Sequence, residues 1–385
     1  MVNAPSDKFP KGFFWGASTA AYQVEGGIEN TDWAKAGREG KVPSAGKACD
    51  HYNRFEEDFD IARLLGHNAY RFSVEWARIE PEEGKFDEKE IEHYRTVLRS
   101  LKRHGLEPFV NLWHYTLPIW FEKMGGFEHK NAEVIFSRYC ASVVGKLGSE
   151  AKFWLTINEP MSWASGGYRI GKWPPFKKSI FTFIKIQSRL AAVHNLAYDE
   201  MKKVVPNIQI GIAKDNMYFA SNGRWWNTLA KHVMDWFWNE RFLNATEGHQ
   251  DFIGLNHYFY KQFGSKKKLP QSDMGWDIYP EAIYHCLVDL KKYKKPVYVS
   301  ENGVADETDT QRGDFIKNYL SCVKKAIDDG VDVRGYFYWS LMDNFEWSFG
   351  FQKKFGLVAL EPETLNRKIR PSAFVYKDII EHQSS

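Results

Sequence analysis

The sequence predicts an α/β protein folded as a single (β/α)8 barrel, with its active site at the C-terminal ends of the strands. Eight short apolar segments alternate with eight helical segments along the 385 residues, and this alternation is typical of a parallel sheet. A count of eight favours closure into a barrel over an open, doubly wound sheet. No Gly-, Pro- or Ser-rich linker divides the chain, so we expect residues 1–385 to form one domain.

The predicted strands are short runs of apolar residues, several of which end abruptly in polar residues. They lie at residues 13–18, 68–75, 107–113, 152–157, 208–213, 251–256, 296–300 and 333–339. Continuous rather than alternating apolar character is typical of parallel strands, which are buried on both faces.

Each predicted helix follows one of these strands, and its apolar residues recur every three to four positions. In the first, Tyr52, Phe55 and Phe59 share one face, and Gly66 ends the helix. The eight lie at 51–66, 87–104, 131–147, 181–205, 225–243, 276–293, 312–329 and 372–382. The fifth is unusually aromatic, and Pro280 limits the start of the sixth.

Composition argues against several classes of partner. A net charge of +3 gives no reason to expect nucleic acid or an anionic membrane, and no apolar run approaches the ~18 residues that a membrane helix needs. Residues 1–11 are polar and lack a signal-peptide core, and the four cysteines show no CxxC pattern. We therefore expect a cytoplasmic protein with reduced cysteines, without a metal site, and without a nucleotide cofactor because GxGxxG and GK[ST] motifs are missing.

Two of the predicted strands run directly into a glutamate. The strand at 152–157 is followed by Asn158, Glu159 and Pro160, and the strand at 296–300 by Glu301, Asn302 and Gly303. Either glutamate alone has an ordinary interpretation, Glu159 as a helix cap and Glu301 as part of a turn. Together, at the ends of two parallel strands, they indicate a site that holds a pair of carboxyl groups.

Other polar and aromatic residues lie within or just after the remaining strands. They are Gln23, Arg71, Glu75, His114, Asn256, Tyr258 and Trp339. A polyhydroxylated ligand needs such amide, imidazole and carboxylate partners, and its C–H faces need an aromatic platform. A glycosidic bond needs two carboxyl groups for its cleavage. On spacing alone, Arg71 could equally be a structural ion-pair partner, and His114 and Trp339 could belong to the core.

Tryptophan is abundant in this chain, with 15 residues. This number fits a large aromatic core, and it fits equally a cleft whose walls stack on the flat faces of a ligand.

Seven stretches resemble glycoside hydrolase family 1, the β-glucosidase family. They lie at Gly12–Gly26, Ala48–Tyr52, Tyr70–Ser73, Thr156–Pro160 (TINEP), Asp251–Asn256, Ser300–Gly303 (SENG) and Gly335–Trp347. These matches span nearly the whole chain in the order of the family. The resemblance implies the same (β/α)8 TIM barrel and a cofactor-free glycosidase that acts on a small β-glycoside.

The resemblance also implies roles for individual residues. Glu159 would be the acid/base and Glu301 the nucleophile, with Arg71 and Tyr258 keeping the nucleophile ionised and oriented. Asn158 would bind the sugar 2-hydroxyl, and Trp339 would be the platform. The remaining substrate-binding positions would be Gln23, His114, Asn256, Glu346 and Trp347.

The resemblance narrows the expected substrate to an unphosphorylated β-O-glucoside, with β-galactosides and β-fucosides as further candidates. Relatives specific for 6-phosphorylated sugars have a different residue pattern at and after the position of Glu346. A carboxylate at that position would repel a phosphate. The segment Leu357-Val358-Ala359 lacks the tyrosine of that pattern. Thioglucosidase relatives replace the acid with glutamine, whereas this chain has Glu159.

The chain departs from the family pattern in three places. Residues 214–251 form a shorter segment than is usual in the family. The stretch 260–274 is also short, and it is basic, with Lys266, Lys267 and Lys268. Thr116 replaces an aspartate that is common in the family. These loops would line the cleft mouth, where Tyr115 and Trp163 are also expected. Two alternatives stay open: a sugar-binding barrel without activity, and a glycosidase or transglycosidase that prefers another neutral sugar. The sequence does not indicate the oligomeric state.

Overall fold

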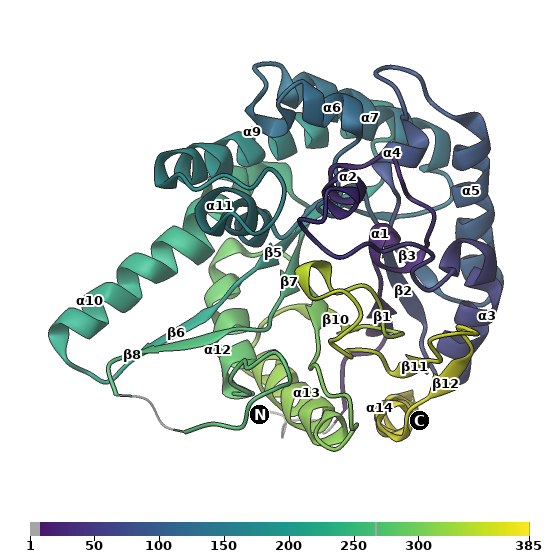
Figure 1. Ribbon diagram of the computed structural model, residues 1–385. Helices are drawn as coiled ribbons and strands as arrows, with labels where there is room; N and C mark the ends of the chain where they lie inside the picture. The colour runs from purple at the N-terminus through teal and green to yellow at the C-terminus, as the bar shows by residue number, and fades with distance from the viewer. Residues whose placement is uncertain (1–7, 266–267, 385) are drawn as a thin grey trace.

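The computed structural model describes residues 8–265 and 268–384, and its centre is a closed barrel of eight parallel strands (Figure 1). Around the barrel the strand order is β1-β10-β9-β7-β5-β4-β3-β2, so neighbouring strands follow the chain order all the way to closure. This arrangement confirms the predicted (β/α)8 barrel. Lys266 and Lys267 of the predicted basic stretch lie outside the described residues.

The barrel strands agree with the eight predicted apolar runs. They are β1 (Phe14–Ser18), β2 (Ala69–Ser73), β3 (Glu107–Asn111), β4 (Phe153–Asn158), β5 (Gln209–Asp215), β7 (Phe252–Asn256), β9 (Val297–Asn302) and β10 (Val333–Trp339). Strands β4, β5 and β9 each run one or two residues further than predicted, so Glu301 lies within β9 and not after it.

Helices surround the strands and cover them with their apolar faces. The longer ones are α3 (His51–Leu64), α5 (Glu88–Arg103), α7 (Ala132–Leu147), α9 (Ile180–Val204), α10 (Trp225–Met234), α12 (Glu281–Leu290), α13 (Arg312–Asp328) and α14 (Pro371–Ser384). Helix α12 begins only after Pro280, because proline fixes the backbone of the entry turn and cannot donate within a helix. The predicted helix at 225–243 is instead α10, a π-helical turn η3 (Asp235–Glu240) and α11 (Arg241–Thr246).

Short elements lie between the main strands and helices. The sequence did not predict them, apart from η5, which falls at the end of the helix predicted at 276–293. The short helices are α1 (Ala21–Val24), α2 (Asp32–Arg38), α4 (Trp76–Ile79), α6 (Ile119–Lys123), η1 (Gly126–Glu128), α8 (Pro160–Ala164), η2 (Ser165–Ile170), η4 (Glu247–His249), η5 (Lys291–Tyr293) and η6 (Trp347–Phe349). Strands β11 (Val358–Leu360) and β12 (Arg367–Ile369) pair antiparallel, while β6 (Tyr218–Ser221) and β8 (Tyr260–Phe263) pair parallel. The β6–β8 ribbon and α10 project away from the barrel (Figure 1).

An aromatic cluster fills the barrel interior at its amino end, where the strands begin. Its members come mainly from the first residues of the strands and include Phe14, Phe109, Phe153, Phe252 and Tyr298. The rings of Phe109 and Phe153 stack with centroids 4.3 Å apart. Because this cluster fills the amino end of the barrel interior, we expect a ligand to enter from the carboxyl end, where the polar residues lie.

Candidate active site

A pocket of about 140 Å³ opens at the carboxyl end of the barrel. Eight of the predicted site residues line it: His114, Asn158, Glu159, Tyr258, Glu301, Trp339, Glu346 and Trp347. Parallel pairing brings the strand ends together: Asn256 of β7 pairs with Glu301 of β9 and Asn158 of β4 with Ala213 of β5, each just after a register shift in its ladder. Eight of the 17 residues that line this pocket were therefore predicted from the sequence.

Glu159 lies between β4 and α8 in a left-handed backbone conformation, with φ of 44°. Pro160 is the first residue of α8, a position that suits proline, but the Glu159 side chain caps no backbone N–H. Its carboxylate instead accepts hydrogen bonds from Tyr115 at 2.5 Å and Asn256 at 2.9 Å. A non-glycine residue rarely adopts this backbone conformation, and such strain is concentrated at functional sites. The interpretation of Glu159 as a helix cap is therefore wrong.

The environment of Glu159 favours its protonated form. Burial, followed by the negative charges of Glu301 and Asp215, raises its pKa to about 8. The hydrogen bonds from Tyr115 and Asn256 oppose this rise. No lysine or arginine among the described residues forms an ion pair with Glu159. At neutral pH the carboxyl group can therefore carry the proton that a general acid needs.

Glu301 has a contrasting set of partners. Its carboxylate forms a buried ion pair with Arg71 and accepts a hydrogen bond of 2.8 Å from Tyr258. Burial keeps the pKa of Glu301 above its ordinary value on balance, but Arg71 and Tyr258 lower it, and Glu159 has no such cationic partner. When one proton is shared between two nearby carboxyl groups, the group beside the arginine ionises first. Glu301 is therefore the charged member of the pair.

Gly303 is required by close packing and not by an unusual turn. A Cβ at this position would lie 1.8 Å from the carbonyl oxygen of Trp339, far inside contact distance. The missing side chain lets the segment after Glu301 pass directly against the end of β10.

Asn158, Asn256 and His114 form a connected group beside the two carboxylates. Asn158 accepts hydrogen bonds from Arg71 at 2.6 Å and from Asn256 at 3.1 Å, and its amide nitrogen lies 3.2 Å from Nε2 of His114. Burial and the neighbouring Arg71 hold the pKa of His114 well below its usual value, so the imidazole is neutral. A neutral imidazole can accept a hydrogen bond as well as donate one.

Glu346 contributes a third buried carboxyl group to the pocket. Burial, then the charges of Glu301 and Glu159, raises its pKa to about 8, and hydrogen bonds with Gln23 and Trp339 oppose the rise. Its Oε2 atom is buried and has no hydrogen-bond partner among the described residues. A buried polar atom without a partner costs free energy, so a ligand hydroxyl would stabilise it.

Two tryptophans and a histidine form the aromatic wall. The His114 ring stacks on Trp339 at 5.9 Å and on Trp347 at 6.0 Å, and Trp347 also stacks on Tyr22. The tryptophans divide between the pocket lining and the core. Trp173, Trp276, Trp339 and Trp347 line the pocket, whereas Trp33, Trp76, Trp113, Trp154 and Trp163 are fully buried. Trp163, expected at the cleft mouth, is therefore a core residue.

Three predicted site residues lie behind the pocket wall. Arg71 and Asn256 hold the carboxylates, and Gln23 donates hydrogen bonds to Asn344 at 2.9 Å and to the Phe345 carbonyl at 2.7 Å. Glu75, which also follows a strand, caps α4 and accepts a hydrogen bond from Thr116 at 2.9 Å. Strand position alone does not distinguish a lining residue from one that supports it.

The sequence did not predict the charge of Asp215 beside Glu159. Asp215 is the last residue of β5, where it is buried and pairs with Lys214 at 3.0 Å. Its second carboxylate oxygen accepts hydrogen bonds from the backbone and the hydroxyl of Ser162. The sequence did contain evidence for this residue, because an aspartate follows the apolar run at 208–213. It was missed because the predicted strand stopped two residues too early.

Comparison with known proteins identifies the family. The model of glycosyl hydrolase family 1 matches residues 5–247 and 256–385. The chain belongs to glycosyl hydrolase family 1. Enzymes of this family are retaining β-glycosidases, so the protein is a retaining glycoside hydrolase of the β-glucosidase type.

Individual relatives agree over almost their whole length. Beta-glucosidase A of Acetivibrio thermocellus is 33% identical, over 97% of this chain and 98% of the relative. The alignment spans 440 positions, more than the 385 residues of this family 1 chain, so that relative has segments that this chain lacks.

Solved structures show the same similarity. A β-glycosidase from Pyrococcus horikoshii is 36% identical, with a TM-score of 0.90 over 98% of this chain and 95% of that chain. The β-glucosidase of Thermotoga maritima in complex with deoxynojirimycin is 31% identical, with a TM-score of 0.91 over 98% and 99%.

Proposed function

We propose that this family 1 enzyme hydrolyses unphosphorylated β-O-glucosides from the non-reducing end by double displacement. The observation that carries the proposal is the contrast between two buried carboxyl groups in one pocket. Glu301 is paired with Arg71, whereas Glu159 has burial and two negative charges to raise its pKa to about 8. Such a difference separates a charged nucleophile from a protonated acid.

In the first step, the Glu301 carboxylate attacks the anomeric carbon of the bound sugar. The bond to the leaving oxygen breaks, and Glu159 donates its proton to that oxygen, so the aglycone leaves as a neutral alcohol. The product of this step is a glycosyl ester on Glu301. Arg71 and Tyr258 orient the attacking oxygens, and Asn158 would bind the sugar 2-hydroxyl, where contacts strengthen in the transition state.

In the second step, Glu159 is ionised and acts as a base. It removes a proton from a water molecule, whose oxygen attacks the anomeric carbon and releases Glu301 as a carboxylate. Each step inverts the configuration at the anomeric carbon, so the product retains the configuration of the substrate. Negative charge leaves Glu301 when the ester forms, which lowers the pKa of Glu159 between the steps because the largest Coulombic contribution to its pKa disappears.

Several features of the pocket support a neutral sugar. His114, Glu346 and Trp347 would bind its hydroxyl groups, and Trp339 would stack on its C–H face. Gln23 would act from behind the wall, where it holds Asn344 and the Phe345 carbonyl. Glu346 would repel a 6-phosphate once ionised, and its unpartnered Oε2 would accept or donate one hydroxyl hydrogen bond. The β-glucosidases among the relatives support glucose as the sugar, with galactose and fucose as further candidates.

Hydrolysis of four aryl glycosides tests this proposal. The substrates are the β-glucoside, β-galactoside, β-mannoside and 6-phospho-β-glucoside, each assayed beside a Glu301→Gln control. We expect activity on neutral sugars, led by the glucoside, and its loss in the control. Preference for the phosphorylated sugar would contradict the role of Glu346. Binding without turnover in the folded protein would favour the alternative of a non-catalytic sugar-binding barrel.

We also propose a cytoplasmic location. The support is that Cys49, Cys140 and Cys286 are buried and Cys322 half-buried as free thiols, as expected in a reducing compartment. Within residues 8–265 and 268–384, no helix combines the length and apolar character needed to cross a bilayer. Fractionation of cells that express the protein would check the location.

A further inference from the structure

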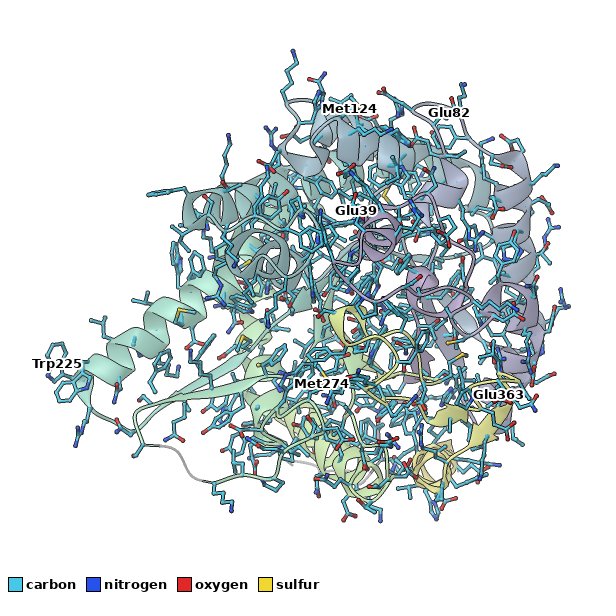
Figure 2. The ribbon with its side chains drawn as sticks, in the orientation of Figure 1. Glu39, Glu82, Met124, Trp225, Met274 and Glu363 are labelled. Carbon is cyan, nitrogen blue, oxygen red and sulfur yellow. The ribbon has the colours of Figure 1, made fainter. Side chains whose placement is uncertain are left out.

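Helix α10 is the one long helix of the described chain that buries no residue. One side contacts the β6–β8 ribbon, where Thr228 and Ser221 share a hydrogen bond of 3.0 Å. The opposite side is open to solvent. Trp225 at the start of the helix lies at the far tip of the projection and points away from the barrel (Figure 2).

The open side is a continuous apolar stripe. Its members recur every three to four residues, so they share one face of the helix and of the π-helical turn that follows. They are Trp225 (72% exposed), Trp226 (49%), Leu229 (57%), Val233 (54%) and Trp236 (52%). Single exposed apolar residues are ordinary, but a stripe with three tryptophans marks a surface that is covered in use.

The residues that follow the stripe in the chain reach a cavity beside the cleft. Trp238 of η3 lines a cavity of about 910 Å³, which shares Ser162, Trp173, Phe259, Ser348 and Phe349 with the active-site pocket. In the same turn, the Phe237 ring lies 5.9 Å from Phe183 of α9, and Phe181 at the start of that helix is also exposed. The π-helical turn after α10 therefore borders a cavity that adjoins the cleft mouth.

The charged residues beside the stripe indicate which kind of partner could bind this surface. The sequence contains no aspartate or glutamate from residue 216 to 234 or from 257 to 272. Arg224, Lys261 and Lys268 are exposed there, and within the described residues none of the three forms an ion pair; Lys231 pairs with Asp235 at 2.6 Å. The guanidinium group of Arg224 lies 5.6 Å from the Trp226 ring, so the positive charge borders the stripe directly.

We propose that this surface, formed by α10 and the β6–β8 ribbon, docks on an anionic lipid bilayer. Tryptophan side chains prefer the boundary between headgroups and acyl chains, and arginine and lysine complement anionic headgroups. A second copy of the chain fits less well, because two such surfaces packed face to face would oppose like charges. The net charge of +3 concealed this possibility, since it averages a basic tip with the rest of the molecule. The proposal does not depend on which sugar the active site accepts.

Flotation of the full-length protein with vesicles tests the proposal. Phosphatidylcholine vesicles with and without phosphatidylglycerol are compared at low and high salt. We expect the protein to bind the anionic vesicles and to be partly released by salt, because the headgroup attraction is screened. Trp225→Gln with Leu229→Gln, or Arg224→Gln with Lys261→Gln, should each weaken binding about tenfold or more.

Matched controls keep the result interpretable. Leu64→Gln with Val134→Gln removes two equally exposed apolar residues from α3 and α7 and should leave vesicle binding unchanged. Every variant should retain hydrolysis of a soluble aryl glucoside, which shows that the barrel is folded; Leu229→Gln alone serves if the double variant does not. Equal binding by the stripe variant and the wild type, or no binding at all, would overturn the proposal. A dimer in light scattering that the stripe variant dissociates, without vesicle binding, would overturn it in favour of self-association.

Discussion

The phenolic hydroxyl of Tyr115 donates a hydrogen bond of 2.5 Å to Oε2 of Glu159. Tyr115 reaches this carboxylate because its backbone is left-handed, with φ of 74°, just after His114. The bond stabilises the charged form of Glu159, whereas burial, Glu301 and Asp215 stabilise the neutral form. The pKa of the acid is thus a balance among named groups, and each group can be removed separately.

Replacing Tyr115 with phenylalanine should move the alkaline limb of the kcat/KM profile to higher pH. The substitution removes a donor to the charged carboxylate, so the pKa of Glu159 rises above its value of about 8. The pH profile for an aryl β-glucoside measures the change. A limb that stays in place or moves to lower pH would show that this hydrogen bond does not act on the acid.

Asp215→Asn and Lys214→Met should shift the same limb in opposite directions. Removing Asp215 takes away a negative charge and lowers the pKa of Glu159, whereas removing Lys214 leaves Asp215 unneutralised and raises it. We expect shifts of roughly half a pH unit or more. Shifts of the same sign in both variants would indicate a general disturbance of the site instead of a charge effect.

Tyr258→Phe should affect the acid limb instead. Burial raises the pKa of Glu301, and the 2.8 Å hydrogen bond from Tyr258 opposes that rise, so its loss moves the acid limb to higher pH. A hydrogen bond to a charged group is worth about 1.5–3 kcal/mol, which predicts a loss of about 10- to 150-fold in kcat. The alkaline limb, set by Glu159, is the internal control.

Glu159→Gln should make the rate depend strongly on the leaving group. A positioned general acid contributes about 10²–10⁴ in rate, and poor leaving groups need it most. We therefore expect a large loss on alkyl glucosides and a much smaller loss in the glycosylation step with activated aryl glucosides. Equal losses on both substrates would argue against Glu159 as the acid.

Asp58→Asn should destabilise the fold without changing the pocket. Burial raises the pKa of Asp58, but the hydrogen bonds from His51 and Arg367 lower it below its ordinary value of 3.8. Breaking this buried pair between α3 and β12 should cost about 3–5 kcal/mol at neutral pH. Because the folded-state pKa is depressed, that difference is present above pH 3.8 and shrinks as the pH falls below it.

The exposed pair of Arg334 and Asp332 is the matched control for this stability measurement. Its atoms are 2.7 Å apart, but both side chains are about half exposed. Asp332→Asn should therefore change the free energy of unfolding by at most about 1 kcal/mol in denaturant titrations. A similar cost for both variants would contradict the importance of burial.

The sequence predicted the barrel well because its signals are local. Eight apolar runs, each followed by an amphipathic segment, leave few alternatives for the sheet, and the glutamates after two runs indicate the site. Strands β6 and β8 were missed because each has four residues and pairs only with the other, outside the barrel. The exposed face of α10 was missed because an aromatic helix is ordinarily a buried one.

Position in the sequence predicted which residues gather at the carboxyl end of the barrel. It did not predict which of them line the pocket and which support the lining residues. Asn256 ends its strand as Asn158 does, yet it supports Glu159 from behind the wall. The contact of Tyr115 with Glu159 depends on a left-handed backbone that no residue pattern indicates. Such differences come from φ angles and packing, which become visible only when the strands are placed side by side.

A covalent trap tests the central claim most directly. A 2-deoxy-2-fluoro-β-glucoside with an activated leaving group removes the 2-hydroxyl contact proposed for Asn158 and slows both steps, while the leaving group keeps the first step faster than the second. Mass spectrometry of the intact protein and its peptides should find one fluoroglucosyl group, attached to Glu301 and missing in Glu301→Gln. An active enzyme that forms no adduct, or an adduct on another residue, would contradict the assignment of Glu301 as the nucleophile.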